Sequence, residues 1–583
     1  MFCRNANYQI SMFDPLNRMP KYLIDILKNS WCHAFREYIF PKINEERFSV
    51  LYSDNPATRP NSPVNVIIGL LIIKEIFQDS DEELIGSLHF DIRYQYALHT
   101  TSLERQPVSI NTLSNFRKRV VEYEKETGRD LIKEEVEALA EVIAQYMKID
   151  GKKIRVDSLM VSSSCKKLSR MELIYSLNER MVKLLQEIDP ESIPESCAGY
   201  LEAGYKNEVI YRTKDTEADK KIEVLISQAV DLYYASNKKE VIESEEYKML
   251  ERFFREQTEV LEGKFSIKEA KEIPSDSLQN PTDPDATYRK KYNKGNIGYV
   301  ANVVESFNEE GGVIIQYDLR QNIYSDQQFA KDTIERLPEG EAGNETKVIV
   351  DGTYYSEEIA QKALEKNIEM IPTGLTGKKP SEDKMDYSEY KVDEARNVII
   401  GCPGGEEPYA SYNSKGNYKA YFEVEKCKRC PLKDRCRVKI TERKAVVRIS
   451  EKAYRLSLLR VKMGTEEYRR IASQRAGIEG IPSVLRRKYK VDFMPVRGLL
   501  RSKLWFGFKI AAMNFKSLLK WIKKDPKNRL TPSFLHSFLY LCSSVWLFFD
   551  NRFKKFYLEP ILFVGSAQRI LPGSRPSDHR PRP

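Results

Sequence analysis

The chain has 583 residues, of which 41% are hydrophobic and 31% are charged, with 27 Gly and 27 Pro. This composition is typical of a globular protein large enough to bury a core without disulfides, and it excludes collagen-like chains, mucin-like stalks and wholesale disorder. The formal net charge of +9 is small for this length and by itself indicates no partner.

Targeting and membrane signals are weak. The N-terminus has no basic region followed by an apolar stretch, so we expect no secretory signal and a reducing cytoplasm. One apolar run, 534–549, approaches membrane length, but it includes His536 and falls short of the roughly 20 residues that a spanning helix needs. We therefore expect a cytoplasmic protein without a membrane span.

The positive charge is concentrated in one segment. Residues 415–503 contain 26 Lys or Arg and 9 Asp or Glu, a net of +17, which leaves the rest of the chain at −8. A charged run is often only a solvated surface. Here tyrosines and a cysteine cluster are interleaved with the charges, and this combination favours a polyanionic partner.

The first 145 residues or so are predicted to be helical. An apolar run, 64–77, follows Ser62 as a cap and Pro63 as the first helical residue, and Ser80 caps the next helix. The last helix of this region is expected to end near Met147.

A basic helix is predicted from Ser109 onward. Its exposed side carries Arg117, Lys118 and Arg119, which suits a helix that lies in a DNA groove. The spacing fits a helical bundle with a solvated basic face equally well.

After residue 147 the pattern becomes mixed α/β. Two predicted strands, 153–158 and 347–351, each end in a carboxylate, Asp157 and Asp351. Between them we expect a long helical insertion and then a loop rich in proline. The remaining expected elements are a hairpin of strands 299–304 and 312–317, helices 326–337 and 356–366, and a strand at 369–372.

The absent residue types narrow the chemistry. None of the five histidines lies between residues 100 and 535, so serine–histidine and cysteine–histidine nucleophile pairs are not expected in the α/β region. The sequence also lacks the glycine-rich motifs that bind nucleotides. Carboxylates at a sheet edge remain, and they suit two divalent cations that catalyse phosphoryl transfer. A single Asp at a strand end is more often a cap, but Asp157 and Asp351 occur in matching settings.

Several blocks together resemble bacterial insertion-sequence DDE transposases, which have an N-terminal helical domain and a ribonuclease H-like core. The resemblance covers about residues 10 to 525, and it implies that Asp157, Asp351 and Glu479 are catalytic and bind two Mg²⁺ or Mn²⁺ ions. The blocks are Arg155-Val-Asp157-Ser, Thr282-Asp-Pro-Asp-Ala286 leading to Gly298-Tyr299, Val348-Ile-Val-Asp351-Gly, and Arg475-Ala-Gly-Ile-Glu479.

The last block departs from the family pattern. Ala472 stands where the family commonly has Tyr, and Arg486 stands where it has Lys. Arg475 and Arg486 are expected on one helical face with Glu479, where they could contact DNA phosphate. Gly480 and Pro482 predict that the helix either kinks after Glu479 or ends and restarts. Glu466 and Glu467 are the alternatives for the third carboxylate.

Four cysteines within 35 residues predict a zinc site. They comprise a C-x₂-C core and two outlying thiols, which suits tetrahedral Zn²⁺, and the family resemblance includes a similar block. The alternative is a set of buried free thiols. The residues are Cys402, Cys427, Cys430 and Cys436.

Taken together, the sequence predicts an α/β protein with a ribonuclease H-like mixed sheet, an N-terminal all-α domain, a helical insertion and a small zinc-binding insertion. An amphipathic core helix is expected at 498–524. The expected domains are a helical DNA-binding domain at 1–148, a catalytic core at 149–165, 285–400 and 465–525, a helical insertion and loop at 166–284, a basic cysteine-rich insertion at 401–464, and a partly disordered appendage at 526–583.

The expected function is that of a DNA transposase. It would bind the terminal inverted repeats as a homo-oligomer on double-stranded DNA, and then cleave and join strands with Mg²⁺ and without a nucleotide cofactor. We expect it in the bacterial cytoplasm, associated with the nucleoid when bound to DNA. Two alternatives remain open, a metal-dependent nuclease that does not join strands and an inactive DNA-binding protein derived from a transposase.

Overall fold

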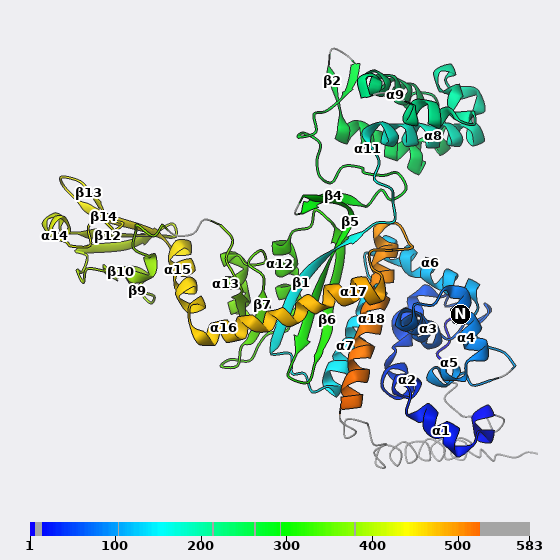
Figure 1. Ribbon diagram of the computed structural model, residues 1–583, viewed down its shortest axis with the longest axis horizontal. Helices are drawn as coiled ribbons and strands as arrows, with labels where there is room; N and C mark the ends of the chain where they lie inside the picture. Colours follow the sequence, from blue (N-terminus) through cyan, green and yellow to red (C-terminus); the bar gives the residue numbers. More distant parts are fainter. Residues whose placement is uncertain are drawn as a thin grey trace, which may run out of the picture. The chain divides into compact units, whose positions relative to one another are not determined.

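The computed structural model describes residues 1–5, 14–102, 104–212, 215–261, 264–291, 293–377 and 381–524 (Figure 1). Met1–Trp521 form one compact unit, which is the part considered below. The expected appendage at 526–583, with its apolar run and Cys542, lies outside the described residues. No helix in the described ranges is long and apolar enough to cross a membrane.

The N-terminal region is helical, as predicted. Ser80 and Ser109 each form a capping box at the start of a helix. The cap of α3 is Pro63 rather than Ser62, because Pro63 has a non-helical ψ of 117°. The longer elements are α1 (Lys21–Lys28), α2 (Trp31–Ala34), the 3₁₀ helix η4 (Glu45–Leu51), α3 (Val64–Phe77), α4 (Asp81–Phe90), α5 (Ile92–Ala97), α6 (Ile110–Thr127) and α7 (Leu131–Tyr146).

A six-stranded mixed sheet forms the centre of the α/β region. The strand order is β4-β5-β1-β7-β8, and β6 also pairs with β5. β1 is antiparallel to β5 and parallel to β7, which is parallel to β8. The predicted hairpin is confirmed as β5 and β6. The strands are β1 (Lys153–Ser162), β4 (Thr287–Lys291), β5 (Lys294–Phe307), β6 (Gly312–Gln321), β7 (Thr346–Val350) and β8 (Ile368–Pro372).

One expected boundary is wrong. The first strand does not end at Asp157 but continues to Ser162, because the long strand β5 pairs with it as far as Gly298. The parallel pairing with β7, in contrast, stops at Arg155. Asp157 therefore lies just beyond the end of the parallel ladder rather than at the end of its own strand.

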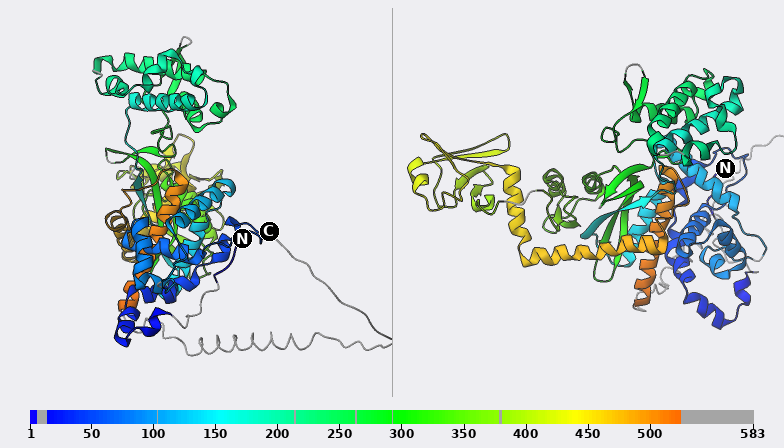
Figure 2. Two further views of the ribbon diagram at one scale, coloured as in Figure 1. Left: turned by 90° about the vertical axis from the view of Figure 1, so that its right-hand side faces the viewer. Right: turned by 45° about the horizontal axis from the view of Figure 1, so that its top comes forward.

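Helices cover both faces of this sheet (Figure 2). On one face α12 (Asp326–Arg336) and α13 (Glu357–Glu365) pack on Val156, Val304 and Val350. At β6 the sheet meets the long helix α18 (Leu499–Lys524), whose Asn514 side chain accepts a hydrogen bond from Ile314 N and donates one to Ile314 O. The amphipathic helix predicted at 498–524 is thus confirmed as a core element.

The insertion after β1 has its own hydrophobic core, built from helices α8 (Arg170–Ile188), α9 (Ala218–Tyr233), α10 (Lys239–Ile242) and α11 (Glu245–Gln257). The sequence did not predict its two short strands, β2 (Thr258–Leu261) and β3 (Lys264–Ile267). They pair antiparallel, and Phe265 packs against Phe254 of α11 with 5.0 Å between ring centroids. Tertiary packing therefore decides the structure of this short segment.

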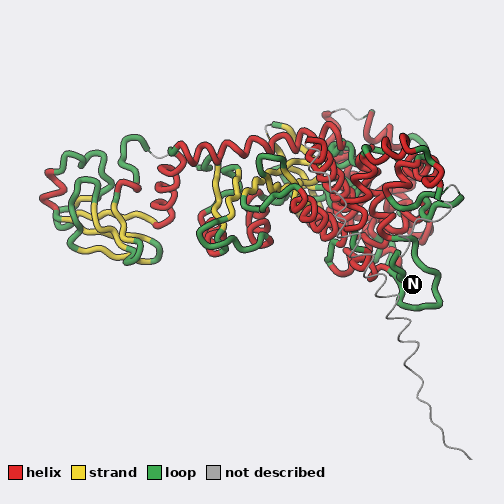
Figure 3. The backbone as a smooth tube through the Cα atoms, turned by 90° about the horizontal axis from the view of Figure 1, so that it is seen from below, coloured by secondary structure: helices red, strands yellow, loops and turns green. Residues whose placement is uncertain are grey.

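A β-rich module that the sequence did not predict overlaps the start of the basic segment (Figure 3). Its four-stranded sheet has the order β11-β12-β14-β13, and a two-stranded sheet pairs β9 with β10. The elements are β9 (Lys391–Asp393), β10 (Val398–Gly401), β11 (Ala410–Ser414), β12 (Asn417–Phe422), α14 (Val424–Arg429), β13 (Lys439–Ile440), β14 (Ala445–Ser450), α15 (Glu451–Met463), α16 (Glu466–Ser473), the 3₁₀ helix η10 (Gln474–Glu479) and α17 (Gly480–Tyr489).

Candidate active site

The first two predicted carboxylates lie on neighbouring parallel strands. Arg155 of β1 is paired with Ile349 of β7, so two further residues on each strand bring Asp157 opposite Asp351. Residues two apart on a strand point to the same face, and adjacent strands are about 4.8 Å apart. The two carboxylates therefore share one face and one edge of the sheet.

Asp157 is largely buried and has a cationic neighbour. Its Oδ1 accepts hydrogen bonds from Ser158 N at 3.0 Å and from Arg475 Nη2 at 3.1 Å. Burial raises the pKa of Asp157, and the charge of Asp351 adds to this rise while that of Arg475 opposes it. Two carboxylates that interact in a buried setting favour the binding of cations.

Asp351 begins a tight turn after β7. Its carboxylate accepts hydrogen bonds from Gly352 N at 2.7 Å and from Thr353 Oγ1 at 3.4 Å. A Cβ atom on residue 352 would lie 2.7 Å from Gly374 O, so the turn requires glycine. The Asp-Gly pair thus fixes the carboxylate at the end of the strand.

The third predicted carboxylate is linked to the first by an arginine. Arg475 donates from Nη1 to Glu479 Oε1 at 3.3 Å and from Nη2 to Asp157 Oδ1 at 3.1 Å. The Arg475 side chain is 14% exposed, whereas that of Glu479 is 65% exposed. The alternatives Glu466 and Glu467 are exposed in the first turn of α16. Of the three candidates, Glu479 is the one that shares a cation with Asp157.

The helix that carries Glu479 ends and restarts, which is the second of the two possibilities predicted from Gly480 and Pro482. The α-helix α16 stops at Ser473, a 3₁₀ turn follows, and α17 starts at Gly480. The expected continuous helical face through residues 475, 479 and 486 is therefore interrupted. Arg486 instead donates to Met160 O at 3.2 Å and forms an ion pair with Asp492 at 3.4 Å.

Sequence reasoning missed the contact that joins the first and last blocks. Arg155 donates to Gln474 O at 2.9 Å and also binds the Glu305 carboxylate. A Cβ atom on residue 477 would lie 1.8 Å from Nη1 of the Arg155 guanidinium, so a larger residue there would displace this side chain. The arginine two residues before Asp157 thereby holds the turn that ends at Glu479. The sequence feature that marked Arg155 as important was its position two residues before Asp157 in the block Arg155-Val-Asp157.

The block at 282–286 has a structural role. The Asp283 carboxylate is fully buried and accepts hydrogen bonds from Tyr299 OH at 2.6 Å and Gly498 N at 3.0 Å. Asp285 accepts one from Leu499 N at 2.8 Å. These contacts tie β5 to the start of α18.

The three predicted DNA-binding residues of α6 differ in their surroundings. Arg117 forms a bidentate ion pair with Asp81, at 2.6 and 2.8 Å, and the pair holds the pKa of Asp81 well below its usual range. Lys118 is 72% exposed, with Glu122 at 3.7 Å. The Arg119 guanidinium lies 5.1 Å from the centre of the Tyr52 ring. Lys118 and Arg119 are thus exposed, whereas Arg117 is engaged by Asp81.

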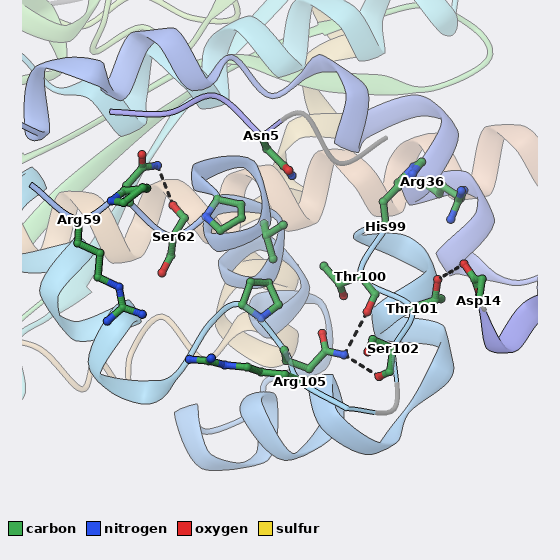
Figure 4. A pocket seen from close by; sticks show the side chains of 16 residues that line it. Asn5, Asp14, Arg36, Arg59, Ser62, His99, Thr100, Thr101, Ser102 and Arg105 are labelled. Carbon is green, nitrogen blue, oxygen red and sulfur yellow. Dashed lines mark hydrogen bonds between the residues drawn. The ribbon is translucent and has the colours of Figure 1, made fainter. Parts of the chain in front are cut away.

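A polar cavity of about 570 Å³ lies among the N-terminal helices (Figure 4). Three arginines line it, Arg36, Arg59 and Arg105, together with Gln106, which donates to the carbonyl of Thr100 at 3.1 Å. None of the predicted DNA-binding residues lines this cavity, which no sequence motif predicted.

The four clustered cysteines line one small cavity of about 30 Å³ in the β-rich module. A Cβ atom on Gly404 would lie 3.3 Å from Cys430 Sγ and 3.7 Å from Cys402 Sγ. Burial raises the pKa of Cys427 to about 11, and the three neighbouring thiols contribute to the rise. All eight cysteines in the described part of the chain are free thiols.

Metal-ligand geometry is not formed at either place. Within the described residues, no group of three or more His, Cys, Asp or Glu side chains is arranged so that it could hold a metal ion. At the carboxylates a guanidinium lies between Asp157 and Glu479. At the cysteines four thiols face a common cavity. Both places offer the donor types that divalent metals prefer, oxygen for Mg²⁺ and sulfur for Zn²⁺.

Comparison with known proteins gives two matches to family models. A model described as a transposase DDE domain matches residues 401–519, which include the cysteine cluster and Glu479. A second, described as a transposase domain (DUF772), matches residues 25–119 in the N-terminal helices. Asp157 and Asp351 lie outside both matched stretches. No curated protein and no solved structure matches the chain.

The two matches lie in the order expected of an insertion-sequence DDE transposase, with the helical domain first and the DDE domain after it. The DDE-domain match includes the block around Glu479, and the mixed α/β fold is compatible with both matches. The two matched stretches thus resemble transposase domains and support an insertion-sequence DDE transposase with an N-terminal transposase domain.

Proposed function

We propose that this protein is a DNA transposase that binds the terminal inverted repeats of its element and catalyses metal-dependent cleavage and transfer of DNA strands, with Asp157, Asp351 and Glu479 as the catalytic carboxylates. One observation carries the proposal: Asp157 and Asp351 are neighbours on parallel strands, and Arg475 connects Asp157 to Glu479. The mixed sheet around them supports a ribonuclease H-like core.

Asp157, Asp351 and Glu479 would hold two Mg²⁺ or Mn²⁺ ions. When bound, such ions activate a water or hydroxyl group and stabilise the entering and leaving oxygens of an in-line displacement. Arg475 keeps Asp157 and Glu479 together through its two hydrogen bonds. Arg155 fixes the turn that leads to Glu479 and so orients the third carboxylate.

DNA contacts are assigned to cations near the carboxylates and on α6. Arg475 and Arg486 flank Glu479 in the chain and would contact phosphate at the cleavage site. Lys118 and Arg119, with Arg117 paired to Asp81, would contact double-stranded DNA from the N-terminal helices. We propose that the protein acts as a homo-oligomer on DNA in the cytoplasm, at the nucleoid.

We also propose that Cys402, Cys427, Cys430 and Cys436 bind a structural Zn²⁺. The four thiols share one cavity, and their deprotonated thiolate forms would be the ligands. Purified protein should contain about one zinc per chain. Metal analysis of Cys427→Ser compared with Cys32→Ser, a change at a buried thiol outside the cluster, would test this, and equal zinc in the two variants would refute it.

The decisive test of function is cleavage of a labelled element end by the full chain. Asp351→Asn should abolish cleavage in Mg²⁺ and retain end binding, because it removes one ligand charge and preserves the turn. The control is Glu358→Gln, an 80% exposed carboxylate on α13, which should cleave normally. Cleavage retained by Asp351→Asn would remove this residue from the site.

An element end that has already been cleaved distinguishes a transposase from a nuclease and from an inactive DNA-binding protein. Joining of its 3′-hydroxyl to target DNA identifies a transposase, whereas cleavage without joining identifies a nuclease. End binding without either reaction in the unmodified chain identifies an inactive DNA-binding protein.

A further inference from the structure

The four-stranded sheet of the β-rich module has one buried face and one open face. Side chains of alternate positions form the buried core, including Tyr418, Phe422 and Val447. The opposite positions of β11, β12 and β14 point outward, and strand pairing aligns Tyr412, Lys419 and Arg448 in one row across them. None of the four strands contains Asp or Glu.

Three tyrosines gather on the open face. Tyr421 lies at the centre, with its ring centroid 6.1 Å from that of Tyr412 and 6.3 Å from that of Tyr409. Tyr409 is 64% exposed and Tyr412 is 43% exposed. A buried hydrophobic core does not account for these rings, because they lie on the solvent side of the sheet.

Cations surround the tyrosines. The Lys419 ammonium lies 5.6 Å from the centre of the Tyr412 ring. The hydrogen bond with Tyr412 lowers the pKa of Tyr421, and the charges of Lys444, Lys419 and Arg448 lower it further. The open face thus combines exposed aromatic rings with positive charge and lacks acidic side chains on its strands.

We propose that this open face binds unpaired nucleotides of DNA, with Tyr409 and Tyr412 stacking on bases and Lys419 and Arg448 contacting phosphates. The chemistry favours single strands because a duplex stacks its base faces on one another, so tyrosine rings reach them only where the strands are unpaired. Four-stranded sheets with exposed aromatic residues bind single-stranded nucleic acids in this way in other folds.

The inference rests on the proposed function, because strand cleavage and transfer create unpaired ends that a transposase must hold. It assigns that task to a module distinct from the carboxylates and from the N-terminal helices. The double-stranded repeat would be bound elsewhere, so the two kinds of DNA binding are separable by mutation.

The test measures DNA binding by the full chain with fluorescence anisotropy, using a labelled mixed-sequence single strand and the same sequence as a duplex. Tyr409→Leu/Tyr412→Leu should weaken single-strand binding by about tenfold or more, and duplex binding by less than about twofold. Tyr409→Phe/Tyr412→Phe keeps the rings and should retain binding. Tyr234→Leu, a change at a 71% exposed tyrosine of the helical insertion, is the control.

The charges are tested by salt dependence. Lys419→Ala/Arg448→Ala should reduce the slope of log K against log salt for single strands by about 0.7 for each lost phosphate contact. Lys239→Ala, at an 81% exposed lysine of α10, should leave the slope unchanged.

Single-strand binding that is absent from the unmodified chain, or unchanged in the leucine variant, would overturn the inference. Equal loss for single strand and duplex would also overturn it, as would equal loss in the phenylalanine variant. These results leave cleavage by the unmodified chain intact. Failure of cleavage with normal single-strand binding would instead overturn the proposed function alone.

Discussion

Arg475 lies between Asp157 and Glu479 and forms an ion pair with each of the two carboxylates. Its guanidinium compensates the two carboxylates, and a divalent ion that binds there must compete with it. The same group could then turn to a DNA phosphate, so one side chain would serve the site both without and with metal.

This competition predicts that Arg475→Ala binds Mn²⁺ more tightly in the absence of DNA, by about tenfold or more, because a positive charge close to the ligands is removed. Electron paramagnetic resonance of free Mn²⁺ measures this affinity independently of activity. End cleavage should fall, since the proposed phosphate contact is lost.

Arg486→Ala is the matched control, because Arg486 binds Met160 O rather than the carboxylates. It should leave the Mn²⁺ affinity unchanged. An Arg475→Ala affinity equal to or weaker than that of the unmodified chain would show that the guanidinium does not compete.

His99 is expected to make the N-terminal helices sensitive to acid. It stacks on Phe40 with ring centroids 5.2 Å apart, and burial lowers its pKa to about 4. Between this value and the usual 6.5 the unfolded chain binds more protons, so the free energy of unfolding should fall as the pH falls, by on the order of 2–3 kcal/mol. Urea unfolding at pH 7 and pH 4.5 measures this loss.

His99→Asn should flatten this pH dependence, because asparagine does not titrate and tolerates the left-handed backbone at this position, where φ is 55°. His89→Asn changes an exposed histidine of α4 and should leave the dependence as it is. An unchanged slope in His99→Asn would assign the acid sensitivity to other groups.

At the scale of elements, the turn η10 depends on one glycine. Gly477→Ala places a methyl group against the Arg155 guanidinium, which Glu305 and Gln474 hold in place. We expect it to destabilise the fold by about 1–3 kcal/mol and to reduce end cleavage more than end binding.

Gly480→Ala is the control three residues later, where an added Cβ atom meets nothing within 4 Å. Thermal unfolding and the cleavage assay should both remain near normal for it. A Gly477→Ala variant that behaved like Gly480→Ala would mean that Arg155 does not set the position of Glu479.

Some elements of this fold could be predicted from the sequence, and others could not. Local signals sufficed for the helix caps at Ser80 and Ser109, because caps depend on adjacent residues. At Gly480 they indicated an interruption of the helix but left its form open. The β-rich module was missed because its strands are only two to six residues long, and short strands depend on pairing with distant segments. The contact of Arg155 with Gln474 joins residues 319 apart, so no local pattern could predict it.

At the scale of the molecule, α18 connects the N-terminal helices to the central sheet. It binds β6 through Asn514, and it binds α3 through a buried ion pair in which Lys509 Nζ lies 2.6 Å from Glu75 Oε2. Burial lowers the pKa of Lys509, and Glu75 opposes this shift. The helical domain and the sheet are thus joined by one helix that makes a buried ion pair with α3 and side-chain hydrogen bonds with β6.

Lys509→Met should destabilise the chain by about 3–5 kcal/mol, because it leaves the Glu75 carboxylate buried without its cation. The double variant Lys509→Met/Glu75→Leu should recover most of this loss. Urea unfolding measures both, with Lys520→Met, at an exposed lysine of the same helix, as control. If the double variant is as unstable as the single one, packing rather than charge explains the effect.

The long strand β5 has a consequence for the insertion between β1 and β4. Ser162 and Thr287, the residues at the two ends of that insertion, pair with the same residue of β5, Gly298, from opposite sides. The chain thus leaves and re-enters the sheet within the width of three strands. The length of the intervening segment can change without stretching β1, so relatives could gain, lose or exchange this module while Asp157 stays in register with Asp351.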